Sequence, residues 1–214
     1  MSEPISVRAR FERFPATLKG AFIFRGEDAD PHQVVLHRAH VTSLGPSGSS
    51  QVPMTAATLA VVPHRDVFVP FELPVTELDP GWYTLVCEVD VDGSPASFDG
   101  GRRFAVAWPR ATVRRGTIKV ERDLALGDAT VHVDQLDCGG DSAKLHLRVD
   151  PPGPITVKLS ADGRRLDVLE LDLDEATGRG KVTSYPVLRA DASVRIDFKR
   201  RGAEASLEVA LDVG

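Results

Sequence analysis

The stretch "LDPGWYTLVCEVDVDG" (Leu78–Gly93) predicts a sharp corner, a strand and a hairpin turn in direct succession. Proline fixes φ and glycine permits a positive φ, so Pro80-Gly81 lets the chain turn abruptly. From Tyr83 onward apolar and polar residues alternate, which is the period of a strand with one buried face. Asp92-Gly93 then supplies the positive φ angles that a two-residue type I′ turn requires. The stretch therefore indicates an antiparallel β-fold.

The same alternation recurs along the rest of the chain. It is clearest in "TVHVDQL", "KLHLRVD", "ITVKLS", "VLELDLD", "SVRIDF" and "SLEVALDV". Asp162-Gly163 and Arg201-Gly202 separate such segments and predict two more hairpin turns. Strands are expected near Val7, Ala21, Val35, Ala60, Phe71, Leu85, Ala105, Ile118, Val131, Leu145, Val157, Leu169, Val182, Ile196 and Val209. Many short strands with turns between them predict an all-β sandwich or barrel.

The length of 214 residues allows two domains of ordinary size, each with its own core. The boundary is expected in "AWPRATVRRG" (Ala107–Gly116), because Pro109 ends one strand and Gly116 frees the chain before the next. The predicted organisation is an N-terminal sandwich at 1–109, a linker at 110–116 and a C-terminal sandwich at 117–214. The predicted fold class is thus all-β, with two tandem antiparallel β-sandwich domains.

The corner at Leu78–Tyr83 resembles the tyrosine corner of immunoglobulin-like and fibronectin-type sandwiches, whose tyrosine hydrogen-bonds back to the preceding turn. The resemblance implies an immunoglobulin-like first domain with the Tyr83 ring in its core. The alternation places Leu85, Cys87, Val89 and Val91 on the same core face. Cys87 follows Tyr83 by four positions, whereas antibody domains place the cysteine two positions after the tyrosine. A sandwich of non-antibody type is therefore expected.

A second resemblance concerns "LKGAFIFRG" and "FVPFELPVTELDPGWYTL". These segments are similar to the N-terminal half of arrestin-like proteins, which are tandem β-sandwiches that act as adaptors. The second half of the chain carries no matching landmark. Both resemblances speak to architecture, because a sandwich does not by itself fix a function.

Composition argues against several functions. The net charge of −5 disfavours nucleic-acid binding, which needs a basic surface. The opening "MSEPISVRARFERF" carries charges where a signal peptide needs an apolar core, and no apolar run reaches the ~18–20 residues of a membrane helix. Cys87 and Cys138 lie in different halves and are expected to be buried thiols in a reducing compartment. A cytoplasmic protein without membrane insertion is predicted.

Common catalytic motifs do not occur in the sequence. There is no G-x-S-x-G elbow, no G-x-x-x-x-G-K-[ST] loop, no H-E-x-x-H and no C-x-x-C. A site built from distant residues stays possible, because catalytic triads are defined by geometry. No cofactor is expected.

Two histidines of the second half are candidates for a site. His132 and His146 flank the turn "DCGGDS" of an expected hairpin, and both face solvent. In one register the two rings oppose each other; in the other, His132 opposes Arg148 while His146 opposes Asp134. Either register suits a weak metal site of His132, His146 and Asp134, or a pH-sensitive pair. The plain alternative is a solvated strand face.

Other possible ligands are weaker. His37 and His40 are three apart on an expected strand, so they should point to opposite faces and share no metal. Loop carboxylates gather in two groups, Asp90/Asp92/Asp99 and Asp172/Asp174/Glu175. Such groups can bind calcium, but neither fits the twelve-residue calcium loop.

Partner-binding candidates combine arginine and tryptophan, which are enriched at protein interfaces. They are Arg102, Arg103, Trp108, Arg110, Arg114 and Arg115, together with Trp82, which the alternation sends outward. The flexible loop expected at Ser43–Pro53 is a further contact candidate. Solvation of strand ends is the alternative role for the arginines.

These observations favour a non-catalytic cytoplasmic adaptor that binds another protein. Exposed edge strands would also allow strand addition or self-association. A ligand-binding sandwich for carbohydrate or calcium is the second hypothesis. A metal-assisted hydrolase centred on His132 and His146 is the third.

Overall fold

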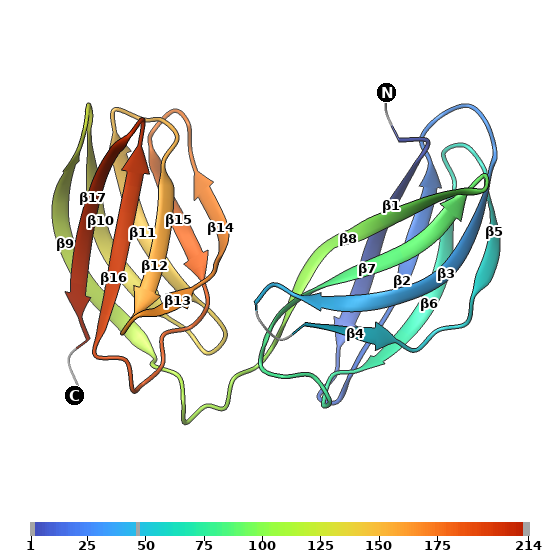
Figure 1. The fold of residues 1–214 in the computed structure, drawn as a ribbon, viewed down its shortest axis with the longest axis horizontal. Helices are drawn as coiled ribbons and strands as arrows, with labels where there is room; N and C mark the ends of the chain where they lie inside the picture. Colours follow the sequence, from blue (N-terminus) through green and yellow to red (C-terminus); the bar gives the residue numbers. More distant parts are fainter. Residues whose placement is uncertain (1–2, 46–47, 212–214) are drawn as a thin grey trace. The chain divides into compact units, whose positions relative to one another are not determined.

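The structure is a computed structural model that describes residues 3–45 and 48–211. Every regular element within these residues is a β-strand. The described part of the chain has no helix that is long and apolar enough to cross a membrane. The strands form two compact units, Met1–Val106 and Ala107–Gly214, each with its own hydrophobic core (Figure 1). The predicted all-β class with tandem antiparallel sandwiches is confirmed.

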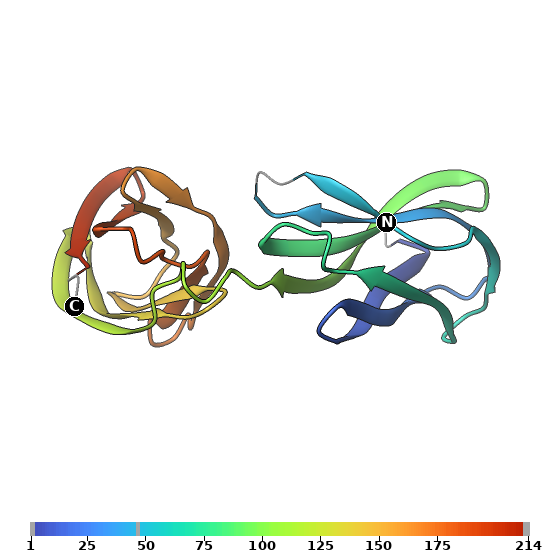
Figure 2. The ribbon, with the colours of Figure 1, turned by 90° about the horizontal axis from the view of Figure 1, so that it is seen from below.

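Two antiparallel sheets face each other in the first unit (Figure 2). One has the order β1 (Ile5–Arg13), β2 (Thr17–Gly26), β6 (Asp66–Pro74). The other contains β3 (His32–Ser43), β7 (Gly81–Val91) and β8 (Ser94–Val106), with β4 (Ser49–Val52) and β5 (Ala57–Val61) paired to β3. The inner faces of both sheets enclose one core, which includes Phe22, Phe24 and Leu36.

The expectation of a loop over Ser43–Pro53 is wrong in part, because β4 lies within it. The last residues of β3 extend beyond β5, so they have an open edge to which β4 adds. Val52 anchors β4 in the core with only 1% of its surface exposed. A four-residue strand is too short to give a readable alternation. Residues 46 and 47 of the expected loop lie outside the described residues.

The tyrosine corner is present as predicted. The Tyr83 hydroxyl donates a hydrogen bond of 2.9 Å to the backbone carbonyl of Asp79. Its ring is 2% exposed and stacks on Phe104 with 5.7 Å between the ring centroids. The predicted core face of β7 is confirmed, since Leu85, Cys87, Val89 and Val91 are all buried. This bond ties the start of β7 to the turn before it.

The second unit also consists of two sheets, which curl toward each other when viewed end-on (Figure 2). One has the order β14 (Val168–Leu173), β15 (Arg179–Ser184), β11 (Ala143–Asp150), β10 (Ala129–Cys138), β9 (Gly116–Leu126). The other has the order β13 (Arg164–Leu166), β12 (Thr156–Ala161), β16 (Ser193–Arg200), β17 (Ala203–Ala210). β9 and β17 lie together at one margin. At the other margin β14 faces a sheet that ends in a three-residue strand.

All three expected hairpin turns occur. Asp92-Gly93, Asp162-Gly163 and Arg201-Gly202 have positive φ at both residues. They join β7 to β8, β12 to β13 and β16 to β17.

The residues predicted as a linker, 110–116, are attached to the second unit. Val113 is fully buried, and the Arg114 amide donates 2.9 Å to the carbonyl of Val187. Just before them, Trp108 packs edge-on against Tyr185 at 5.6 Å. Burial of one apolar side chain and backbone hydrogen bonds therefore hold this segment in place.

The tyrosine corner makes a testable contribution to stability. We expect Tyr83→Phe to lower the free energy of unfolding of the first unit by about 1 kcal/mol, because the ring packing stays and one hydrogen bond is lost. Urea unfolding followed by Trp82 fluorescence, in a Trp108→Phe background, measures this change. Tyr83→Leu, which also removes the stacking on Phe104, should cost more. Equal stability of Tyr83→Phe and wild type would show that the hydroxyl contributes nothing.

Candidate functional sites

A shallow groove of about 940 Å³ lies on the solvent face of the sheet β14-β15-β11-β10-β9. Its lining includes the predicted candidates His132, His146 and Asp134. The remaining lining residues are Glu121, Arg122, Asp123, Val133, Leu147, Arg148, Asp172, Asp174, Arg179, Gly180 and Lys181. This charged groove is the first candidate functional site.

The structure corrects both expected registers of the histidine hairpin. His132 does oppose Arg148, but His146 opposes Gln135 and not Asp134. The cause is a β-bulge between Val133 and Gln135, which inserts Asp134 as an unpaired, exposed residue. A bulge adds one residue to one strand and shifts every pair beyond it. The two imidazoles therefore do not meet.

Each histidine of the groove has its own carboxylate. His132 Nδ1 lies 2.6 Å from Asp123, and His146 Nε2 lies 2.8 Å from Asp137. Hydrogen bonds from Thr117 and His146 lower the pKa of Asp137. Among the described residues, no three His, Cys, Asp or Glu side chains are arranged to hold a metal ion. His132, His146 and Asp134, the weak candidates for metal ligands, are therefore not brought together as one ligand set.

Charge in the groove follows the strand order. Asp123 lies on an edge strand, β9, and Asp172 lies on the other edge strand, β14. The central strands β15 and β11 carry Arg179 and Arg148, which oppose each other directly. Arg122 on β9 and Lys181 on β15 also line the groove. The groove therefore has a cationic centre, acidic residues at both margins and one further arginine, Arg122, at the β9 margin.

His37 and His40 share a face, contrary to the prediction. A register shift between Leu36 and Arg38 adds one residue to β3, so both rings point outward. His37 lies 2.9 Å from Asp90, and His40 lies 3.7 Å from Glu88. The two histidines contact different carboxylates.

The carboxylates considered for calcium bind groups of the protein itself. Asp92 contacts His32, and Asp99 accepts a hydrogen bond of 2.6 Å from the Thr84 hydroxyl. Asp174 accepts hydrogen bonds from the following turn, 2.7 Å from the Thr177 amide. Neither expected group forms a shared set of ligands.

The predicted partner-binding residues belong to two different units. Trp82, Arg102 and Arg103 lie in the first unit. Arg102 stacks on the Phe11 ring, 4.6 Å from its centroid, and Trp82 is half-buried. Trp108, Arg110, Arg114 and Arg115 lie in the second unit, where Arg110 and Arg115 are exposed and Trp108 and Arg114 are half-buried. Their role in binding stays a prediction.

A second hollow, the β14 slot, lies where β14 forms the margin of the second unit. Its volume is about 540 Å³. Leu171 and Leu173 line it from β14, and Ile155 lines it from the loop before β12. Leu171 opposes the core residue Val182, so it faces inward, yet 37% of its surface is exposed. The short strand β13 on the facing sheet leaves this leucine uncovered.

Two aromatic rings of the first unit, Phe14 and Phe68, are exposed although the sequence analysis predicted neither. Phe14, just after β1, is 43% exposed. Phe68 on β6 is 59% exposed and lies beside Ile23, which is 1% exposed although it points away from the core. The signal was available, since "DVFVPFELP" alternates and Phe68 falls on its outward positions.

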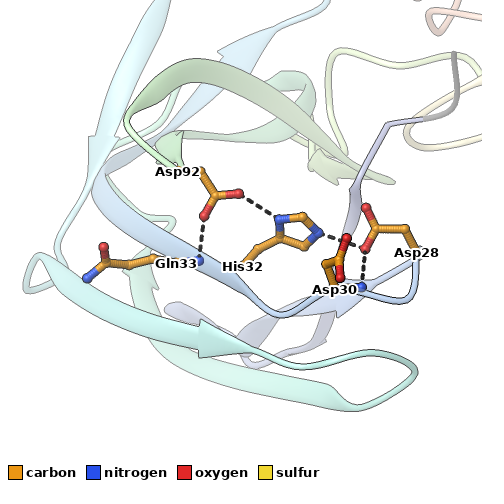
Figure 3. Close-up of polar contacts among 5 residues, drawn as sticks. All are labelled: Asp28, Asp30, His32, Gln33 and Asp92. Carbon is orange, nitrogen blue, oxygen red and sulfur yellow. Dashed lines mark hydrogen bonds and ion pairs between the residues drawn. The ribbon is translucent and has the colours of Figure 1, made fainter.

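A histidine latch joins the β2–β3 loop to the β7–β8 turn (Figure 3). The His32 side chain is only 9% exposed, and its Nδ1 and Nε2 each lie 2.7 Å from a carboxylate, of Asp92 and Asp28 respectively. The Gln33 amide also donates a hydrogen bond of 2.8 Å to Asp92, and the Asp30 amide donates one of 3.2 Å to Asp28. The hydrogen bonds to Asp92 and Asp28 raise the pKa of His32, and the bond to His32 lowers the pKa of both carboxyls. No spacing in the sequence indicated this contact.

The fold and these sites define the class. The first unit is an immunoglobulin-like β-sandwich, identified by its two facing antiparallel sheets and its tyrosine corner. No protein-family model matches the sequence, and no curated protein matches it.

Solved structures give remote likenesses. A conserved domain protein from Bacillus anthracis is 9% identical, with the match covering 100% of this chain and 89% of that one at a TM-score of 0.35. Two marsupial T cell receptor chains are 15% and 13% identical, with TM-scores of 0.30 and 0.28. The first of these matches covers 100% of this chain and 99% of that one, and the second covers 98% and 63%.

The latch predicts a pH dependence of stability. A raised pKa of His32 means that its contribution is complete below the ordinary value of 6.5 and is lost as pH rises through the raised value. The lowered pKa values of Asp28 and Asp92 mean that their contribution is present above 3.8 and is lost on acidification.

We expect the melting temperature of the first unit to fall as pH rises above the ordinary histidine pKa of 6.5, and to fall less in His32→Gln. Thermal melts followed by Trp82 fluorescence, again with Trp108→Phe, measure the difference. His64→Gln is the control, because His64 lies in the same unit, is exposed and forms no ion pair with a described residue. It should keep the wild-type slope. Parallel pH profiles for wild type and His32→Gln would contradict the latch.

Proposed function

We propose that the chain is a non-catalytic, cytoplasmic protein-interaction module that binds an extended segment of a partner protein by strand addition at β14. The observation that carries the proposal is the uncovered inward face of β14, where Leu171 is exposed although it opposes a core residue. An added strand would bury that face and complete the sandwich margin. The free buried thiols Cys87 and Cys138 accord with a reducing compartment.

The backbone of β14 supports strand addition. The Asp174 amide donates a hydrogen bond of 2.9 Å to the carbonyl of Arg179. Asp174 and Arg179 are therefore a hydrogen-bonded pair of the β14–β15 ladder. Hydrogen-bonded and non-bonded pairs alternate along antiparallel strands. Leu171 opposite Val182 is therefore a non-bonded pair, and the Leu171 N–H and C=O point to the open edge. These groups are the partners that an incoming strand requires.

Two edge strands of the first unit contain proline. Pro70 and Pro74 lie on the edge strand β6, and Pro95 lies on the edge strand β8. Proline has no N–H to donate, and edge prolines discourage pairing with other chains. β14 contains no proline.

The charge around β14 specifies the kind of segment. Glu170 on β14 and Glu175 just beyond it are exposed, and neither forms an ion pair with a described residue. In an added strand, every second side chain would enter the β14 slot, and the side chains between them would lie on the solvent face of the sheet, near Glu170. The expected partner segment therefore alternates apolar residues with lysine or arginine.

Peptide selection tests the proposal. Random linear peptides displayed on phage are selected against the full chain, and the binding of enriched peptides is then measured by calorimetry. We expect alternating apolar and basic sequences. We also expect Leu171→Pro to weaken their binding about tenfold or more, because an outward N–H is lost while the β15 ladder stays intact.

Leu171→Asp is the second variant, since it keeps the backbone donor and removes the apolar contact. It should weaken binding while the melting temperature shows that the second unit is folded. Phe68→Ala, an apolar truncation on the other unit, is the control and should bind as wild type does. Failure to enrich any peptide, or binding lost in Phe68→Ala and kept in both Leu171 variants, would overturn the proposal.

A further inference from the structure

Two facing arginines at the centre of the groove have no internal partner. Arg148 on β11 and Arg179 on β15 oppose each other directly, on the solvent face of the sheet. Neither guanidinium forms an ion pair or hydrogen bond with a described residue. Like charges directly opposite each other on a sheet are destabilising. An anion bound between the two guanidinium groups would remove this repulsion.

Most nearby carboxylates are already bound. Asp123 contacts His132, Asp172 pairs with Lys181 at 3.6 Å, and Asp174 accepts from its own turn. Glu121 and Asp134 remain, and both are exposed on the β9–β10 side of the groove. The arginine pair is therefore not neutralised by its neighbours.

A third donor extends the row. His132 on β10 opposes Arg148, so the sheet carries Arg179, Arg148 and His132 side by side on three neighbouring strands. Asp123 holds the Nδ1 side of the imidazole. The Nε2 atom of His132 is then available to hydrogen-bond a ligand in the groove. Long arginine side chains on adjacent strands can converge on one oxyanion with several charge-assisted hydrogen bonds.

We infer that the centre of this groove binds a single phosphate or sulfate group carried on a small polar molecule, held by Arg148, Arg179 and His132. Tetrahedral oxyanions match the several N–H groups that two guanidinium groups present. The volume of about 940 Å³ accommodates more than the oxyanion alone. The site is distinct from the β14 slot, which lies at the edge and inner side of the same sheet.

The acidic margins restrict the ligand. Glu121 and Asp123 border the groove on β9, and Asp172 and Asp174 border it at β14. They repel a polyanion such as a nucleic acid or an anionic membrane surface, which would extend beyond the cationic centre. They accept hydrogen bonds from hydroxyl or amino groups on the body of a small ligand. A phosphorylated or sulfated sugar has this combination of groups.

Calorimetry on the full chain tests the site with four probes: inorganic phosphate, inorganic sulfate, glucose 6-phosphate and a short single-stranded oligonucleotide. We expect glucose 6-phosphate to bind at one site, more tightly than inorganic phosphate or sulfate, and the oligonucleotide not to bind. Arg148→Gln and Arg179→Gln should each weaken glucose 6-phosphate binding about tenfold or more.

Lys144→Gln is the matched control, because Lys144 lies on the same face of β11 outside the groove. It should bind as wild type does. Without ligand, Arg148→Gln should melt at or above the wild-type temperature, which shows that the variant is folded. Glucose 6-phosphate should raise the melting temperature of wild type and not that of Arg148→Gln.

Absence of saturable binding by phosphate, sulfate and glucose 6-phosphate would overturn the inference. An equal loss in Lys144→Gln, or binding of the oligonucleotide as tight as that of the sugar phosphate, would also overturn it. Leu171→Pro should leave oxyanion binding unchanged, so failure of strand addition and failure of this site are separate outcomes.

Discussion

The inner face of each sheet has to be covered by the other sheet of its sandwich, and apolar surface stays exposed where this cover is incomplete. In the first unit, β4 and β5 extend the sheet along β3, and the core includes residues as large as Phe22 and Phe24. In the second unit, β9 and β17 lie together at one margin, while β13 at the other spans three residues. Leu171 is exposed because of that short strand. The same hydrophobic requirement that builds the core thus leaves an apolar slot at its edge.

The outer faces follow a different rule, since charged groups there are paired across strands. His132 with Asp123, His146 with Asp137 and His37 with Asp90 are examples. Exposed pairs of this kind contribute little to stability, with a median near 0–1 kcal/mol. Their significance lies in the contrast with Arg148 and Arg179, which oppose each other without an acid between them. This pair of like charges in a groove is the observation from which the oxyanion site is proposed.

One sheet of the second unit therefore carries both proposed sites. The oxyanion site occupies its solvent face over β15, β11 and β10, and the slot lies at the margin of β14. Asp174 borders both hollows, and its carboxylate is fixed by the turn that joins β14 to β15. This turn is the structural link between them.

The sequence alone determined the strands other than the short β4 and β13, the hairpin turns and the tyrosine corner, because each depends on neighbouring residues. Alternation reports which face of a strand is buried, and Asp-Gly pairs report positive φ. It could also have shown Phe68, whose outward position follows from the same alternation. These features needed no knowledge of which strands pair.

Tertiary structure alone decided the register and the contacts across it. The bulge at Asp134 moves His146 away from its expected neighbour, and the shift after Leu36 puts His37 and His40 on one face. A bulge inserts a single residue without a local sequence signature. His32 contacts Asp92, which lies 60 positions further along the chain. Arg148 lies opposite Arg179 because β11 pairs with β15 in one particular register. Local sequence patterns do not specify the register between strands that are far apart in the chain.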